Sequence, residues 1–120
     1  SLSFDQHMER GNNLKNLDPR TAMTHFAAAA QAKPGQVAPV SAMGDCAANM
    51  GNLDQARRHY ENALRLRDSY GPALIGMARI HKRTGDSVGA LRFYRRYLEV
   101  NSRGSQADEA RAFVEAQQAR

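Results

Sequence analysis

GNLDQARRHYENAL, residues 51–64, and GDSVGALRFYRRYL, residues 85–98, carry one pattern in two copies. Four positions match: Gly51 with Gly85, Ala56 with Ala90, Tyr60 with Tyr94, and Leu64 with Leu98. Matching positions are 34 residues apart. A third copy lies another 34 residues upstream, where Ala22, Phe26, Ala29 and Ala30 correspond to Ala56, Tyr60, Ala63 and Leu64. A fixed period of 34 residues predicts a repeat architecture, in which each unit buries its apolar face only by stacking on a neighbour.

The apolar pattern is helical throughout, and no segment shows the sustained alternation of a strand. Breaks at Gly and Pro predict seven helices, at about residues 4–17, 19–32, 38–50, 53–67, 72–84, 87–100 and 105–118. Asp18 and Asp86 are predicted N-caps, and Gly51 is placed to end a helix in the left-handed conformation. Ser105, with Asp108 three residues on, is expected to open the last helix in a near capping box.

Small and aromatic residues alternate between the helices of each predicted pair. Gly44 and Ala78 lie at the centre of the first helix of their respective pairs, where a small side chain lets two backbones approach closely. Phe26, Tyr60 and Tyr94 lie on the other helix and are expected to fill the wedge between successive pairs. Short turns make such neighbours antiparallel.

The period and the spacing G-x4-A-x3-Y-x2-[AY]-L resemble tetratricopeptide repeats. The resemblance covers residues 4–104, as repeats at about 4–35, 37–70 and 71–104, and residues 105–118 are either a capping helix or the first helix of a fourth repeat. Asp68 and Ser102 stand where the family has proline, and Tyr97 replaces a small residue. The resemblance implies an all-α solenoid with a right-handed superhelical twist, in one domain over residues 1–120.

The resemblance also implies a concave groove, lined by the first helix of each repeat, that binds a peptide or helix of a partner protein. The resemblance, together with helical spacing, implies that the groove contains the following residues: Met8, Asn12, Lys15, Asn16, Ser41, Asp45, Ala48, Asn49, Ile75, Arg79, Lys82 and Arg83. Some relatives hold a partner's terminal carboxylates with five Lys, Asn and Arg side chains. Only Asn12 fits that set, because Met8, Ala42, Pro72 and Gly76 occupy the other positions. A carboxylate clamp without its cations is therefore disfavoured.

Catalysis and cofactor binding are not expected. No paired carboxylates, Ser/His/Asp set or glycine-rich phosphate loop is present. The four histidines show no i, i+4 or HExxH spacing, so we expect no metal site and place them on helices of separate repeats, either facing solvent or at the groove rim. Cys46 lies in an alanine-rich stretch and is expected to be a buried free thiol.

The net charge of +5 belongs to the third repeat. Residues 71–104 hold seven basic and two acidic residues, whereas the rest of the chain holds ten of each. Arg79, Lys82 and Arg83 are expected on the groove face, and Arg92, Arg95 and Arg96 on the outer surface. A concave surface of one sign attracts an acidic or amphipathic partner segment. Nucleic-acid binding is the alternative, but no interleaved aromatic platform accompanies the arginines.

These features predict a non-catalytic protein-interaction scaffold. The Ala- and Arg-rich composition suggests a bacterial protein, for which pilus, secretion or envelope assembly is the first context to test. Self-association through the ends of the solenoid is a further alternative. The single cysteine fits a cytoplasmic or periplasmic protein. The chain begins without Met or a signal peptide, so we expect a fragment, and no stretch is long and apolar enough to span a bilayer.

Overall fold

The computed structural model describes all residues, Ser1–Arg120, and contains seven helices and no strand. They are α1 (Phe4–Leu14), α2 (Pro19–Ala32), α3 (Val37–Asn49), α4 (Leu53–Leu66), α5 (Gly71–Arg83), α6 (Ser87–Val100) and α7 (Ser105–Gln118). The predicted order is confirmed, but α1 ends three residues earlier than expected. The amide nitrogens of Leu17 and Asp18 both donate to the Leu14 carbonyl, so residues 15–17 form a turn.

Helix ends follow the capping residues of the sequence with one exception. Asp18 and Asp86 each accept a hydrogen bond from a first-turn backbone amide, and Gly51 has a φ of +79°. Ser105 was wrongly predicted as a cap. Gly104, at a φ of +99°, is the N-cap of α7 and Ser105 already lies in the helix, so its hydroxyl does not cap the first turn.

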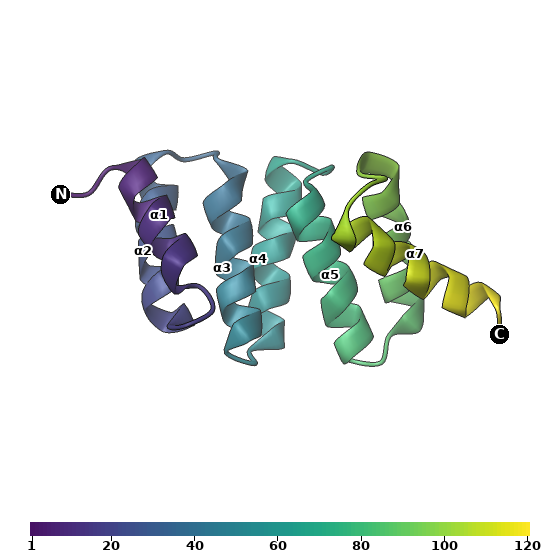
Figure 1. Cartoon of the computed structure of the whole chain (residues 1–120). Coiled ribbons are helices and arrows are strands. Elements are labelled where there is room, and N and C mark those ends of the chain that lie inside the picture. The colour runs from purple at the N-terminus through teal and green to yellow at the C-terminus, as the bar shows by residue number, and fades with distance from the viewer. The chain divides into compact units, whose positions relative to one another are not determined.

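The chain divides into two compact units, Ser1–Asp68 and Ser69–Arg120. The division falls between the second and third repeats. The single domain predicted over residues 1–120 therefore stays a prediction. In the first unit, α1 packs on α2, α2 on α3 and α3 on α4, and Figure 1 shows these four helices side by side from purple to teal. Its core contains Ala22, Phe26, Ala42 and Cys46, with methionines packed around them.

In this unit small and aromatic residues pack on each other within a helix pair. Phe26 is fully buried, and Tyr60 is 3% exposed. A Cβ added to Gly44 would lie 2.7–3.0 Å from atoms of the Tyr60 ring, and one added to Gly11 would lie 2.6–2.9 Å from the Phe26 ring. Each glycine therefore provides the space that the aromatic ring occupies.

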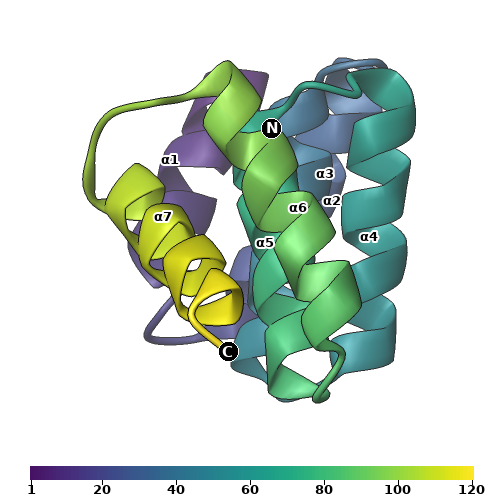
Figure 2. The ribbon, with the colours of Figure 1, turned by 90° about the vertical axis from the view of Figure 1, so that its right-hand side faces the viewer.

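The second unit contains α5, α6 and α7. α5 is its most buried helix, with seven buried residues from Ala73 to Ile80, and it packs on α6. In Figure 2, α7 (yellow) lies beside α6, after the loop of residues 101–104. Only Ala107 and Ala110 of α7 are buried. None of the seven helices combines the length and apolar character needed to span a membrane.

Candidate functional site

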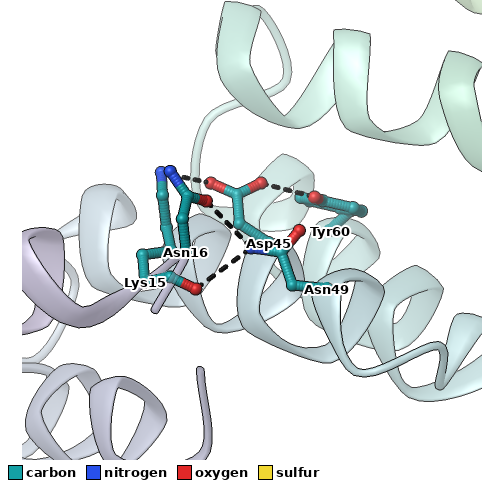
Figure 3. A network of polar contacts seen from close by, with 5 residues as sticks. All are labelled: Lys15, Asn16, Asp45, Asn49 and Tyr60. Atoms are coloured by element: carbon teal, nitrogen blue, oxygen red, sulfur yellow. Dashed lines mark hydrogen bonds and ion pairs between the residues drawn. The ribbon is translucent and has the colours of Figure 1, made fainter. Parts of the chain in front are cut away.

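A polar cluster in the first unit joins the end of α1 to α3 and α4 (Figure 3). We call Lys15, Asn16, Asp45, Asn49 and Tyr60 the Asp45 cluster. Lys15 Nζ lies 3.1 Å from Asp45 Oδ2, and the Tyr60 hydroxyl donates to Asp45 Oδ1 at 2.5 Å. Four of its five members were predicted at partner-binding positions, and the fold brings them together although they come from separate repeats.

The early end of α1 explains how this cluster forms. The last carbonyls of a helix have no intrahelical partner. Asn49 Nδ2 donates to the Lys15 carbonyl and to Asn16 Oδ1, both at 3.1 Å. α3 therefore supplies the hydrogen bond that the turn after α1 lacks, and the Lys15 side chain is directed to Asp45. The Lys15 and Asp45 side chains are 29% and 31% exposed, so the cluster reaches solvent.

Cys46, next to Asp45, has no exposed surface. Burial raises the pKa of its thiol to about 11, and the negative charge of Asp45 contributes to this increase. A thiol with this pKa stays protonated near neutral pH, and the thiolate is the reactive form. Cys46 is therefore a core residue, as the sequence suggested.

A second cluster lies in the second unit, where α7 meets α5 and α6. We call Arg79, Tyr94, Glu109, Lys82 and Phe113 the Glu109 cluster. Arg79 donates to the two Glu109 carboxylate oxygens at 3.0 and 2.7 Å, and the Tyr94 hydroxyl donates to Glu109 Oε2 at 2.8 Å. Lys82 Nζ lies 5.9 Å from the centroid of the Phe113 ring, which is 5.0 Å from the Tyr94 ring.

The charges of this cluster stabilise one another. The hydrogen bonds from Arg79 lower the pKa of Glu109, although partial burial opposes them. Burial, followed by the hydrogen bond to Glu109, raises the pKa of Tyr94. Both shifts favour an ionised carboxylate that accepts from a neutral phenol and a charged guanidinium. Arg79 thus has an acidic partner within its own chain.

The remaining predicted residues divide by burial. Asn12, Lys82 and Arg83 are exposed, whereas Met8 and Ala48 are half-buried, Met8 against the core of the first unit. Ser41 and Ile75 are only 1% and 2% exposed. Their side chains fill the interior in this structure and do not form part of a surface.

Two histidines lie closer together than the sequence suggested. His7 and His25 were placed on separate repeats, but they belong to the α1–α2 pair and their Nδ1 atoms are 3.0 Å apart. Their ring centroids are 5.3 Å apart, so the two nitrogens face each other as hydrogen-bond donor and acceptor. No group of three or more His, Cys, Asp or Glu side chains is arranged to hold a metal ion.

The arginines of α6 lie over an aromatic ring. Arg92 and Arg96 each place a guanidinium 5.2 Å from the centroid of the Phe93 ring. His81 stacks on the same ring at 5.5 Å and bonds to Asp86. Phe93 is 6% exposed, so these cations cover the ring.

Sequence reasoning missed Tyr60, Tyr94, Glu109 and Phe113 as members of polar clusters. The two tyrosines were assigned only to packing, although a buried phenol usually finds a hydrogen-bond partner. Glu109 and Phe113 could have been found from the repeat period, which aligns them with predicted groove positions of the third repeat. One period further along the chain, Ile75 corresponds to Glu109, and Arg79 to Phe113.

Comparison with models of protein families matches residues 37–103 to the tetratricopeptide repeat. The chain belongs to the tetratricopeptide repeat family. The match covers more than half of the sequence and includes both copies of the pattern that opened the sequence analysis. The predicted all-α solenoid of helix pairs is confirmed. Among curated protein sequences, none matches this chain significantly.

Solved structures of other tetratricopeptide repeat proteins have the same fold. PcrH from Pseudomonas aeruginosa is 20% identical with a TM-score of 0.85, over 98% of this chain and 96% of that one. It is also solved with the chaperone binding region of PopD. The Yersinia enterocolitica type III secretion chaperone SycD, in complex with a YopD peptide, is 16% identical with a TM-score of 0.83, over 96% and 92% of the chains.

The first tetratricopeptide repeat domain of Spaghetti, bound to an HSP90 peptide, is 19% identical with a TM-score of 0.82, over 97% and 94% of the chains. In this chain, the positions of a carboxylate clamp hold the buried Ala42 and Gly76, neither of which has a charged side chain. The resemblance to that domain therefore concerns the fold.

Proposed function

We propose that this tetratricopeptide repeat chain is a non-catalytic interaction module that binds a peptide or helix of a partner protein on its A helices, which are α1 and α3 in the first unit and α5 in the second. The Asp45 cluster is the observation that carries this proposal. It brings side chains of α1 and α3 together at a surface, with amide and ammonium groups that suit a peptide backbone and acidic side chains. The peptide-bound structures of similar fold support the same interpretation.

The partner segment that fits is acidic or amphipathic. The excess positive charge lies in residues 71–104, and Lys82 and Arg83 are exposed on α5. Charge of one sign raises the association rate of an oppositely charged segment. We take bacterial secretion, rather than pilus or envelope assembly, as the first context to test, since a type III secretion chaperone has a similar fold.

The proposal is tested by capture of partners from the source cell with the chain as bait. The first variant is Asn12→Ala with Asn16→Ala, which removes two exposed amides from the end of α1. The second is Lys82→Glu with Arg83→Glu. Asn13→Ala is the matched control, because Asn13 is also exposed and lies beside Asn12 in the sequence. Circular dichroism confirms that each variant keeps its helicity.

The expected result is a partner protein that the wild type and Asn13→Ala capture and that both double variants lose. Titration of a peptide from that partner then measures the affinity directly. Equal capture by all four proteins, with helicity intact, would contradict the proposal. Capture of nucleic acid, with an affinity that falls steeply with salt, would instead favour the alternative of a basic nucleic-acid surface. Light scattering at several concentrations tests self-association.

A further inference from the structure

α7 has the register of an A helix. The three helices α3, α5 and α7 begin at Val37, Gly71 and Ser105, which are evenly spaced by one repeat period. The sequence of α7 does not suit the interior position of an A helix. Asp108 and Arg111 replace Leu74 and Met77, which are buried in α5, so this face of α7 is polar.

Besides the hydrogen bond that Tyr97 donates to Gln106, α7 contacts α5 and α6 through two side chains one helical turn apart. Glu109 accepts hydrogen bonds from Arg79 and Tyr94, and Phe113 lies between the Tyr94 ring and the Lys82 ammonium. The surface of α5 and α6 at this point therefore binds one carboxylate and one aromatic ring at positions i and i+4. These are the acidic and apolar groups expected of an amphipathic partner helix.

α7 is held weakly in comparison with its neighbours. It buries two residues, whereas α5 buries seven. Its ion pair with Arg79 is partly exposed, at 47% for the Arg79 side chain and 32% for the Glu109 side chain, so solvent and salt screen it. Gly104, at a φ of +99°, joins it to the preceding loop. Helices with few buried contacts open locally before the rest of a domain unfolds.

We infer that the Glu109 cluster is a docking site for a partner helix that carries an acidic residue four positions before an aromatic one. In the free chain α7 occupies this site, and the partner helix displaces it. Charge complementarity supports this occupant, because the site contributes the cations Arg79 and Lys82 and α7 contributes the acidic Glu109. The inference rests on the proposed function and names the chemistry of its partner. The partner helix binds only after α7 has left the site. The apparent affinity of the chain for the partner is therefore reduced in proportion to the fraction of molecules in which the site is open.

The test uses the full chain and a fluorescent peptide of residues 105–120, which supplies the Glu109 and Phe113 contacts of α7 in trans. The chain variant Glu109→Ala with Phe113→Ala removes these contacts in cis. Glu115→Ala with Gln118→Ala is the matched control, because both side chains are exposed on the same helix. Fluorescence anisotropy is expected to show binding at least about tenfold tighter to the Glu109/Phe113 variant than to the wild type or the control. A peptide with the same two substitutions is expected not to bind.

Equal affinity of the peptide for all three proteins, or equal affinity of both peptides, would overturn the inference. Hydrogen exchange of the wild type is a second measurement, which is independent of whether the variant folds. Excess peptide should accelerate exchange in residues 105–118 and protect residues 79–94. An α7 as protected as α5, and unchanged by the peptide, would also overturn it. Partner capture that depends on Asn12 and Asn16 would leave the proposed function standing in either case.

Discussion

Removing one hydroxyl from the Asp45 cluster should destabilise the chain more than removing its ion pair. The Tyr60 residue is 3% exposed, and its hydroxyl donates to the Asp45 carboxylate. A hydrogen bond to a charged group contributes about 1.5–3 kcal/mol. We therefore expect Tyr60→Phe to lower the free energy of unfolding by about 2 kcal/mol. The Lys15 and Asp45 side chains are 29% and 31% exposed, and partly solvated pairs contribute only about 0.2–1 kcal/mol.

The assay is urea denaturation followed by circular dichroism, on Tyr60→Phe, Lys15→Met, Asp45→Ala and the Tyr60/Asp45 double variant. Lys15→Met keeps the length of the side chain and removes its charge. Because the Tyr60 hydroxyl and the Lys15 ammonium share one carboxylate, Asp45→Ala should lower the free energy of unfolding by about 2–4 kcal/mol, near the sum of the losses for Tyr60→Phe and Lys15→Met. The Tyr60/Asp45 cycle should give a coupling energy above about 1 kcal/mol.

Two results would refute this reasoning. One is a larger loss for Lys15→Met than for Tyr60→Phe, which would make the ion pair the stabilising contact. The other is a coupling energy below about 0.5 kcal/mol, the usual error for independent sites, because the hydroxyl and the carboxylate would then act separately.

Three further predictions concern the interior of the first unit. Gly44→Ala should lower the free energy of unfolding by about 1 kcal/mol, measured by urea denaturation, because overpacking against Tyr60 costs about 1–3 kcal/mol and the better helix propensity of alanine offsets about 1 kcal/mol. Cys46, with a pKa of about 11 and no exposed surface, should react with a thiol reagent at neutral pH only when the unit opens, so labelling that is independent of urea would contradict its burial. Burial, followed by the charge of Arg58, lowers the pKa of His59, whose buried Nε2 has no hydrogen-bond partner. The folded state then binds fewer protons than the unfolded state, so stability should fall as the pH drops below about 6.5, and His59→Leu should flatten this dependence in thermal melts.

The sequence predicted the helices because each was specified locally and by repetition. Asp18 and Asp86 cap where their side chains can reach a first-turn amide, and the left-handed Gly51 and Gly85 end helices at equivalent positions. The end of α1 was predicted three residues too late. The amides of Leu17 and Asp18 turn back to the Leu14 carbonyl, and Asn49 bonds to this turn from another helix, a contact that no pattern within residues 4–17 reveals.

The candidate site was predicted in part for the same reason. Helical spacing identified Lys15, Asn16, Asp45 and Asn49 as residues on one face, but it could not show which of them bond to each other. It assigned Arg79 to an incoming partner, whereas the fold pairs it with a carboxylate 30 residues later. Pairings of this kind depend on helix packing and on side-chain reach, so they follow only from the structure.

The two clusters share a chemistry that the repeat alone does not dictate. In each unit a cation pairs with a carboxylate 30 residues later, and that carboxylate also accepts a hydrogen bond from a tyrosine 15 residues away. The tyrosines, Tyr60 and Tyr94, occupy the same repeat position, but Asp45 and Glu109 do not, because the equivalent of Asp45 in the third repeat is Arg79. The phenol is thus a fixed part of the scaffold that provides one hydrogen-bond donor in each of these repeats, while the charged residues around it vary. Exchanging the acidic residue at one cluster should therefore alter the hydrogen bonds of that cluster with little effect on those of the other.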